Sequence, residues 1–263
     1  MATGHPKAEP GDAPIVAVTG VSVLYSNTDG RATWALDSVS LDLYAGGFVC
    51  AVGPSGCGKT TLLNVIGGFL RPARGTVTLD GRVVEGPGPD RGVVFQEYGL
   101  FPWLTVRGNI EFGLVERGIG GTERARLVGT YLDMIGLERA ADRYPFELSG
   151  GMRQRVAVAR ALVNQPRLML MDEPFAAVDA MTRASLQSEL VRLWLHERFA
   201  CFFITHSIEE AVLLGQRILV MSANPGRISA IETVDLPYPR DKHSLAFQDV
   251  VRRVDAELET VES

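Results

Sequence analysis

The residues that most clearly specify chemistry form a glycine-rich loop between a short apolar segment and a stretch of helical periodicity. Glycines let backbone N–H groups converge on phosphate oxygens, and the positive end of the following helix points at the same anion. Lys59 can reach the terminal phosphates, and the Thr60 hydroxyl can bind Mg²⁺. A flexible glycine-rich turn is the alternative, which the flanking apolar and helical segments disfavour. The loop fits G-x-x-x-x-G-K-[ST] and predicts a nucleoside triphosphate site made of Gly53, Pro54, Ser55, Gly56, Cys57, Gly58, Lys59 and Thr60.

A second chemistry-bearing segment is an apolar run, residues 168–171, that ends in Asp172 and Glu173. A carboxylate at the carboxyl end of a buried parallel strand lies beside the phosphate loop of such a fold. Asp172 would then hold Mg²⁺, and Glu173 would take the proton from an attacking water. A strand that ends in two solvated acids explains the same letters, so the pair alone does not decide between the two.

A third segment, Leu-Ser-Gly-Gly-Met-Arg-Gln-Arg at residues 148–155, is a further candidate anion site. Ser149 is a natural helix N-cap, and Gly150 and Gly151 expose N–H groups at a helix start. One triphosphate needs only one phosphate loop, so a second phosphate-seeking helix start in the same chain points to a second chain.

The elements that must position these groups alternate between short apolar strands and amphipathic helices. This alternation is typical of a mostly parallel α/β sheet covered on both faces. Hairpins at 15–43, with a turn at 27–30, and at 76–84 add an antiparallel β edge, and the helix-rich residues 97–160 form an inserted helical subdomain. The expected strands are 48–52, 92–96, 168–171, 201–204 and 218–221; the expected helices are 59–69, 105–116, 122–135, 152–163, 182–197 and 208–214.

The two ends of the chain differ from this core in composition. Residues 1–14 are polar and rich in Pro, Gly and Ala, and we expect a disordered tail. Residues 15–235 would form the domain that binds the nucleoside triphosphate, and residues 236–263 a C-terminal tail. Helical periodicity at 247–258 leaves two alternatives for that tail: a partner-binding segment, or a helix packed on the core.

Composition limits the class of protein. The 263 residues carry a net charge of −5, whereas proteins that bind nucleic acid usually present a basic surface. Cys50, Cys57 and Cys201 form no C-x-x-C pair, so a zinc or redox site is not expected, and an odd count without a signal peptide fits a reducing compartment. No apolar run approaches the ~20 residues of a membrane span.

Together these segments resemble the ATP-binding subunits of ABC transporters, over about residues 15–235. The 148–155 segment matches the ABC signature motif and precedes the acidic strand at the spacing of that family. Gln96 matches the Q-loop glutamine, Asp179 the D-loop aspartate and His206 the switch histidine, while Tyr25 lies where the family stacks an aromatic ring on adenine. The resemblance implies a P-loop NTPase fold of ABC type, with ATP and Mg²⁺ as ligands.

The resemblance also implies a role for each residue. Glu173, His206, Gln96 and Lys59 would be catalytic, and Thr60, Gln96 and Asp172 would hold Mg²⁺. Thr61 would join the phosphate loop and Tyr25 in binding ATP. Ser149, Gly150, Gly151 and Asp179 would act on ATP held by a second subunit, which implies a head-to-tail homodimer with two ATP molecules between its subunits.

Two residues depart from the family pattern. Val178 precedes Asp179 where relatives usually have Leu, and Ser207 follows His206 where Asp is common. Neither change removes a proposed catalytic group, but both could alter how the two ATP sites communicate.

A finer resemblance is to the importers of nitrate, taurine and aliphatic sulfonates. It rests on residues 86–96, 100–106, Asn109, 172–175, 182–183 and 207–211, and residues 110–114 favour taurine. It implies permease subunits and a periplasmic or extracellular substrate-binding protein as partners, and a peripheral place on the cytoplasmic face of the membrane. Phe101, Pro102 and Trp103 are candidate permease contacts; packing of the insert's own core is an equal alternative.

The predicted function is therefore ATP hydrolysis that powers import of a small anion, with taurine or another sulfonate favoured. A nitrate or related anion importer is the alternative. A soluble ABC ATPase acting on nucleic acid is disfavoured by the net acidity, and a non-hydrolysing ATP-binding adaptor is disfavoured by the intact Glu173 and His206.

Overall fold

The computed structural model describes residues 13–26 and 32–262. The tail expected at 1–14 therefore lies almost wholly outside the described residues, as does the turn expected at 27–30. The chain forms two compact units, Met1–Gly88 with Trp194–Ser263 and Pro89–Leu193.

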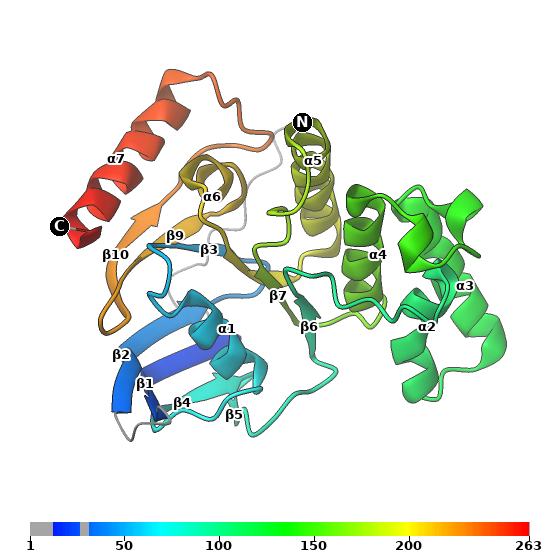
Figure 1. Ribbon diagram of the computed structural model, residues 1–263, viewed down its shortest axis with the longest axis horizontal. Helices are drawn as coiled ribbons and strands as arrows, with labels where there is room; N and C mark the ends of the chain where they lie inside the picture. Colours follow the sequence, from blue (N-terminus) through cyan, green and yellow to red (C-terminus); the bar gives the residue numbers. More distant parts are fainter. Residues whose placement is uncertain (1–12, 27–31, 263) are drawn as a thin grey trace. The chain divides into compact units, whose positions relative to one another are not determined.

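The first unit contains an antiparallel sheet of strand order β2-β1-β4-β5 (Figure 1). Val16 of β1 pairs with Leu43 of β2 on one side and with Leu79 of β4 on the other. The buried residues of β1 include Val16, Val18 and Val21, and their apolar side chains form one face of this sheet's core. The strands are β1 (Val16–Ser26), β2 (Ala32–Leu43), β4 (Arg74–Leu79) and β5 (Arg82–Val83).

The same unit contains part of a second sheet, with strand order β10-β9-β3-β8. β3 is parallel to both β8 and β9, and β10 runs antiparallel to β9. All five residues of β3 and of β8 are buried, which is why both strands appear in the sequence as continuous apolar runs. The elements are β3 (Phe48–Val52), α1 (Lys59–Gly67), β8 (Ala200–Ile204), α6 (Ile208–Leu214), β9 (Arg217–Ser222) and β10 (Arg227–Thr233).

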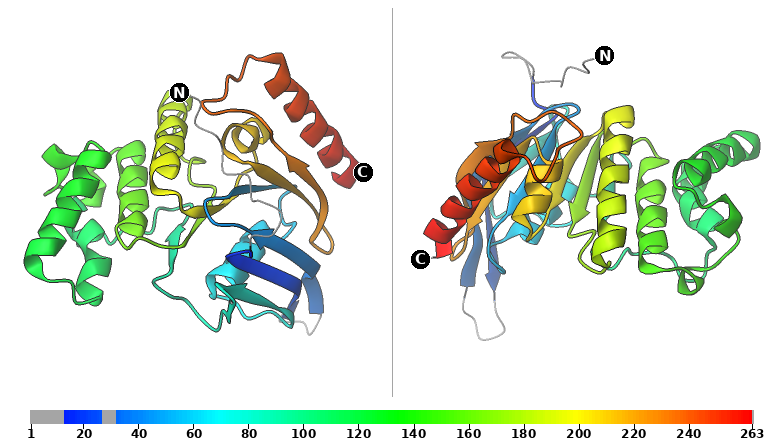
Figure 2. Two further views of the ribbon diagram at one scale, coloured as in Figure 1. Left: turned by 180° about the vertical axis from the view of Figure 1, so that it is seen from behind. Right: turned by 90° about the horizontal axis from the view of Figure 1, so that it is seen from above.

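The C-terminal segment of this unit ends in helix α7 (Leu245–Glu262), which lies along β9, β10 and α6 (Figures 1 and 2). Its apolar stripe, Phe247, Val250 and Val254, is buried. Just before the helix, the buried Arg240 guanidinium donates to the carbonyl oxygens of Val212 and Gly215, at the end of α6. Of the two alternatives for residues 236–263, the structure shows the helix packed on the core.

The second unit pairs two parallel strands with a group of helices. Helix α2 packs against both α3 and α4. Ser149 caps α4, so this helix starts at Gly150, two residues before the expected start. Strand β6 ends at Val94, so Gln96 lies in the turn after the strand. The elements are β6 (Arg91–Val94), α2 (Val106–Glu116), α3 (Gly121–Met134), η1 (Glu138–Ala140), η2 (Pro145–Glu147), α4 (Gly150–Leu162), β7 (Leu168–Asp172) and α5 (Ala180–Glu197).

Candidate functional site

The phosphate loop connects β3 to α1 and takes a backbone path that requires glycine at two positions. Gly53 has φ 157°, and a Cβ there would lie 2.5 Å from the carbonyl oxygen of Met221. Gly58 has φ 94°, and a Cβ there would lie 2.6 Å from the Leu36 side chain. Gly58 is also the N-cap of α1 and supplies no side-chain cap, so the first N–H groups of that helix remain for an anion.

Lys59 holds the loop in this shape. Its side chain is buried, and its ammonium donates to the carbonyl oxygens of Gly53 at 2.7 Å and of Pro54 at 3.0 Å. Ser55, Gly56 and Thr60 are exposed at the mouth of the loop, whereas Cys57 is fully buried. A cation beneath a turn of backbone N–H groups, with a hydroxyl at its rim, fits a polyphosphate.

His206 leaves the sheet beside this loop. β3 and β8 are parallel neighbours with Ala51 opposite Ile204, and the N–H of Thr205 donates to the carbonyl oxygen of Ala51. The phosphate loop and His206 therefore follow neighbouring strands at the same edge of the sheet. Ser207, the departure from the family pattern, caps α6 by accepting from the N–H of Glu210, a role that serine and aspartate fill equally well.

Tyr25 lies near the end of β1, opposite Thr33 of β2. Its side chain is 44% exposed, so the ring is available for stacking on a planar ligand. This placement agrees with the adenine-stacking ring that the resemblance implies, and an ordinary aromatic residue of an edge strand would be exposed in the same way.

The acidic pair and Gln96 meet at a strand edge of the other unit. Val94 of β6 pairs with Met171 of β7 in parallel, so Gln96 and the Asp172–Glu173 pair leave their strands at one edge. Gln96 is exposed, and both carboxylates are half-buried. Glu173 has φ 44°, a left-handed conformation that costs a non-glycine residue about 1–3 kcal/mol and is common at functional sites.

The signature segment begins at an exposed serine, Ser149, followed by the half-buried Gly150 and the buried Gly151. The Ser149 hydroxyl accepts from the N–H of Met152 at 3.3 Å and caps α4. Gly151 is required here because a Cβ would lie 2.6 Å from the Thr182 side chain. Asp179 accepts from the N–H of Thr182 at 3.0 Å, and this hydrogen bond lowers the pKa of the Asp179 carboxyl. The signature and the D-loop turn are therefore in contact through Thr182.

The predicted site residues thus form two groups, one in each unit. In the first unit, the pairing of β3 with β8 places the phosphate loop beside His206. In the second unit, the pairing of β6 with β7 places Gln96 beside Asp172 and Glu173. The first group is Tyr25, residues 53–61 and His206; the second is Gln96, Ser149, Gly150, Gly151, Asp172, Glu173 and Asp179.

Sequence reasoning missed two residues that hold the second group in place. Tyr98 is buried with its hydroxyl oxygen 3.5 Å from the position of a Cβ on Gly150, although 52 residues separate the two. Arg160 donates to the carbonyl oxygens of Tyr98 and Gly99. The sequence offered one signal for Tyr98, its place two residues after Gln96.

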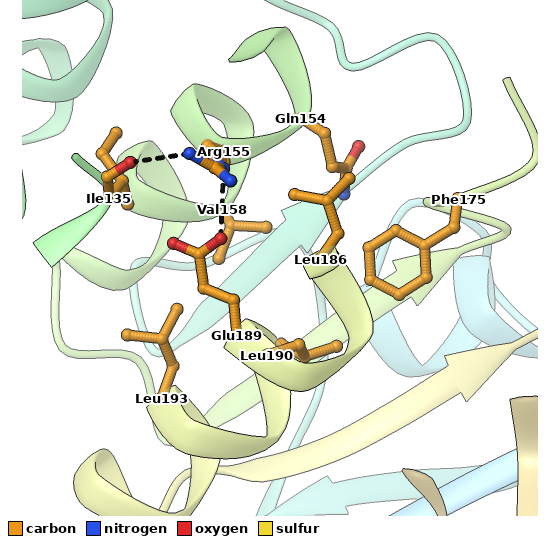
Figure 3. A pocket seen from close by; sticks show the side chains of 9 residues that line it. All are labelled: Ile135, Gln154, Arg155, Val158, Phe175, Leu186, Glu189, Leu190 and Leu193. Atoms are coloured by element: carbon orange, nitrogen blue, oxygen red, sulfur yellow. Dashed lines mark hydrogen bonds and ion pairs between the residues drawn. The ribbon is translucent and has the colours of Figure 1, made fainter. Parts of the chain in front are cut away.

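A pocket of the same unit lies between α4 and α5 (Figure 3). Its walls are mostly apolar, and an ion pair between Arg155 Nε and Glu189 Oε2, 3.1 Å apart, lies on it. Burial raises the pKa of the Glu189 carboxyl, and the charge of Arg155 opposes this. The Gln154 side chain, from the signature helix, extends toward α5 on the same wall.

The fold and the phosphate loop define the class of protein: a P-loop ATPase, in which the helix start at Ser149 is a second candidate anion site. The family model described as ABC transporter matches residues 36–176, and the chain belongs to this family. It is an ABC-type ATPase, which hydrolyses ATP for transport.

Relatives and a solved structure agree with this assignment. The chain is 50% identical to an uncharacterized ABC transporter ATP-binding protein of Methanocaldococcus jannaschii, over 86% of this chain and 85% of that protein. It is 51% identical to the taurine import ATP-binding protein of Rhizobium johnstonii, over 82% of each chain. It is 49% identical to the nitrate import ATP-binding protein of Synechocystis sp., over 77% and 76%.

Among solved structures, the chain resembles the dimeric post-hydrolysis ATP-binding cassette MJ0796 bound to ADP and phosphate. The TM-score is 0.74 at 34% identity, over 84% of this chain and 100% of that one. None of the described helices is both long and apolar enough to cross a bilayer.

Proposed function

We propose that the chain is the ATPase subunit of an ABC importer for a small anion, with taurine or another sulfonate as the favoured cargo. Two relatives at about half identity are a taurine import ATP-binding protein and a nitrate import ATP-binding protein, which supports an importer of this kind. Nitrate or a related anion is the alternative cargo. Net acidity continues to disfavour a nucleic-acid partner.

The observation that carries the ATPase proposal is the pair of anion-binding helix starts. In the proposal, loop 53–61 and Lys59 bind the phosphates of one ATP, and the exposed Tyr25 ring stacks on its adenine. Ser149, Gly150 and Gly151 of a second copy close on the γ-phosphate of the same ATP, with Asp179 beside them. The subunits are therefore proposed to act as a head-to-tail homodimer.

The proposed Mg²⁺ ligands are Thr60, Gln96 and Asp172. A hydroxyl, an amide oxygen and a carboxylate are the oxygen donors that Mg²⁺ prefers, so the donor set fits the ion. When bound, Mg²⁺ neutralises negative charge on the terminal phosphates.

Hydrolysis is proposed to depend on Glu173. Its carboxylate accepts the proton from the attacking water, while Lys59 and His206 stabilise the charge on the transferring phosphoryl group. Closure of the two subunits before hydrolysis and reopening after it would move the permease subunits, and a substrate-binding protein outside the membrane would deliver the cargo to them. This places the chain on the cytoplasmic face of the membrane through its permease.

The first test is Glu173→Gln, which keeps the shape of the side chain and removes the base. We expect an ATP-stabilised dimer in light scattering and a fall in kcat of at least about hundredfold. Glu116→Gln, an exposed glutamate at the end of α2, is the charge-matched control and should keep wild-type turnover. Wild-type turnover in Glu173→Gln would refute the proposed role.

The cargo is tested by purifying the chain from its native membranes in mild detergent. A multi-span membrane protein recovered in equal amount supports the importer, and transport assays of that complex with taurine and with nitrate decide the cargo. Recovery with nucleic acid and no membrane protein would overturn the importer proposal.

A further inference from the structure

The turn that contains Gln96 is attached to helix α4 at two places. The N–H of Tyr98 donates to the carbonyl oxygen of Phe95 at 2.9 Å and that of Gly99 to Glu97, which closes a tight turn around Gln96. From the later part of α4, Arg160 donates to the carbonyl oxygens of Tyr98 and Gly99 at 3.1 and 2.5 Å. The same guanidinium lies 5.4 Å from the centre of the Phe101 ring.

The second attachment is the Tyr98 side chain, at the start of α4. The side chain is 8% exposed, and the Arg153 guanidinium lies 5.8 Å from the ring centre. The hydroxyl oxygen lies 3.5 Å from the position that a Cβ on Gly150 would occupy, which is ordinary contact distance. The Tyr98 backbone has φ 63°, a conformation that a bulky residue adopts only when its surroundings hold it there.

Two residues of the D-loop, Ala177 and Val178, also lie beside Gly150. A Cβ on Gly150 would also lie 3.6 Å from the Val178 side chain and 3.7 Å from the carbonyl oxygen of Ala177. Gly150, the first residue of α4, is therefore enclosed by the Gln96 turn on one side and by the residues before Asp179 on the other. Tyr98 therefore connects the Gln96 turn to the first residue of α4, while Arg160 connects the turn to the later part of the same helix.

The Tyr98 hydroxyl has no hydrogen-bond partner among the described residues, although its oxygen is buried. A buried hydroxyl without a partner adds no hydrogen bond to stability. The length and position of the whole side chain, acting by van der Waals contact rather than by a hydrogen bond, therefore fix the distance between the turn and Gly150.

We propose that Tyr98 is a positioning residue, which sets the place of the Ser149–Gly151 helix start according to the conformation of the Gln96 turn. A change in that turn moves the ring, and the ring moves the anion-binding N–H groups of α4. The inference rests on the proposed function, in which those groups bind the γ-phosphate of ATP held by a second copy. Tyr98 itself touches no phosphate in this scheme.

The test compares Tyr98→Ala and Tyr98→Phe in the Glu173→Gln background, with ATP-dependent dimer formation measured by light scattering. Loss of the ring should raise the ATP concentration for half-maximal dimer formation by at least about tenfold, because the helix start is no longer held for the phosphate. Tyr98→Phe keeps the ring and removes one contact atom that makes no hydrogen bond, so it should stay within about twofold of Glu173→Gln alone. Binding of a fluorescent ATP analogue to the monomer reports the phosphate loop and should change less than about twofold in both.

Tyr131→Ala is the matched control. Tyr131 is also buried, and its hydroxyl donates to the carbonyl oxygen of Leu162 at the far end of the same helix. The Tyr131→Ala variant should be less thermally stable, but it should form the ATP-dependent dimer at the same ATP concentration as Glu173→Gln alone. Arg160→Gln removes the guanidinium that binds the carbonyl oxygens of Tyr98 and Gly99, so it should also raise the ATP concentration needed for dimer formation. This variant tests the inference if Tyr98→Ala does not fold.

Three outcomes would overturn the inference. The first is dimer formation at the level of Glu173→Gln alone in both Tyr98→Ala and Arg160→Gln. The others are a loss of dimer formation in Tyr98→Phe, or in Tyr131→Ala, as large as that in Tyr98→Ala. Failure of Glu173→Gln itself to dimerise with ATP would instead count against the proposed function, so the two failures are distinguishable.

Discussion

Several predicted site residues also have a local structural role at the scale of the single residue. The Ser149 hydroxyl caps α4, the Asp179 carboxylate accepts from the first turn of α5, and Ser207 caps α6. The starts of α4, α5 and α6 are therefore organised by side chains in or next to the motifs, whereas α1 begins at Gly58 without a side-chain cap. This is the physical reason why small hydroxyl and carboxylate residues occur at these positions.

Gln154 has a buried side-chain amide that makes no hydrogen bond among the described residues. Its side chain is 1% exposed, and both polar atoms of its amide lack a hydrogen-bond partner among the described residues. A buried polar group left unpaired costs about 1–3 kcal/mol. We therefore expect Gln154→Leu to raise the free energy of unfolding by about 1 kcal/mol, measured by denaturant titration.

Gln187 on α5 is the control for this prediction. It is similarly buried, at 3% exposed, but its amide atoms are not among the buried polar atoms that lack a hydrogen-bond partner. Gln187→Leu should lower the free energy of unfolding. A loss of stability in Gln154→Leu as large as in Gln187→Leu would show that the Gln154 amide has a partner in solution.

At the scale of the element, the loop before α2 is fixed by hydrogen bonds to one buried side chain. The Asn109 side chain is fully buried, accepts from the N–H of Phe101 at 2.8 Å and donates to the carbonyl oxygens of Phe101 and Leu104. Phe101 packs on Phe112, with ring centres 4.5 Å apart, so it belongs to the packing of the insert. Trp103 is 70% exposed, which leaves it available as the permease contact that the sequence predicted.

Trp103→Ala tests that contact. We expect the amount of permease that co-purifies to fall by at least about tenfold, since an exposed tryptophan anchor often dominates an interface. ATP binding should be unchanged because Asn109 continues to hold the loop. Phe146→Ala, an aromatic of similar exposure in the same unit, is the control. Equal loss of ATP binding and permease association in Trp103→Ala would contradict the prediction.

At the scale of the whole molecule, the C-terminal helix is part of the unit that contains the phosphate loop. α7 packs on β9, β10 and α6, and Arg240 attaches the preceding segment to the end of α6. His206 lies directly before α6, so this packing also supports the strand edge that carries the histidine.

The contribution of α7 is tested by two substitutions two residues apart. Phe247 is fully buried and Leu245 is 82% exposed. Phe247→Ala should lower the free energy of unfolding by about 3–5 kcal/mol because it leaves a cavity. Leu245→Ala should change it by less than about 0.5 kcal/mol. Similar values for the two, in chemical denaturation, would mean that the helix does not contribute to the core.

The sequence by itself determined the class of ligand, a nucleoside triphosphate, and most of the helices and strands. A phosphate loop, a helix N-cap and a buried strand are each set by contiguous residues, so the 53–60 loop, the Ser149 helix start and β3 could be recognised from their letters. The comparisons confirm the ABC family and the fold. The sequence missed β10, an exposed strand without an apolar run, and it placed Gln96 inside a strand that ends at Val94.

Tertiary structure decided the contacts between residues far apart in the chain. No local sequence pattern predicts that Tyr98 contacts Gly150, or that Arg240 donates to carbonyl oxygens at the end of α6. The same holds for Gln154, whose amide faces a helix interface that the signature motif does not encode. Such contacts depend on how the helices pack, and packing is set by the shapes of many side chains at once rather than by the spacing of a few.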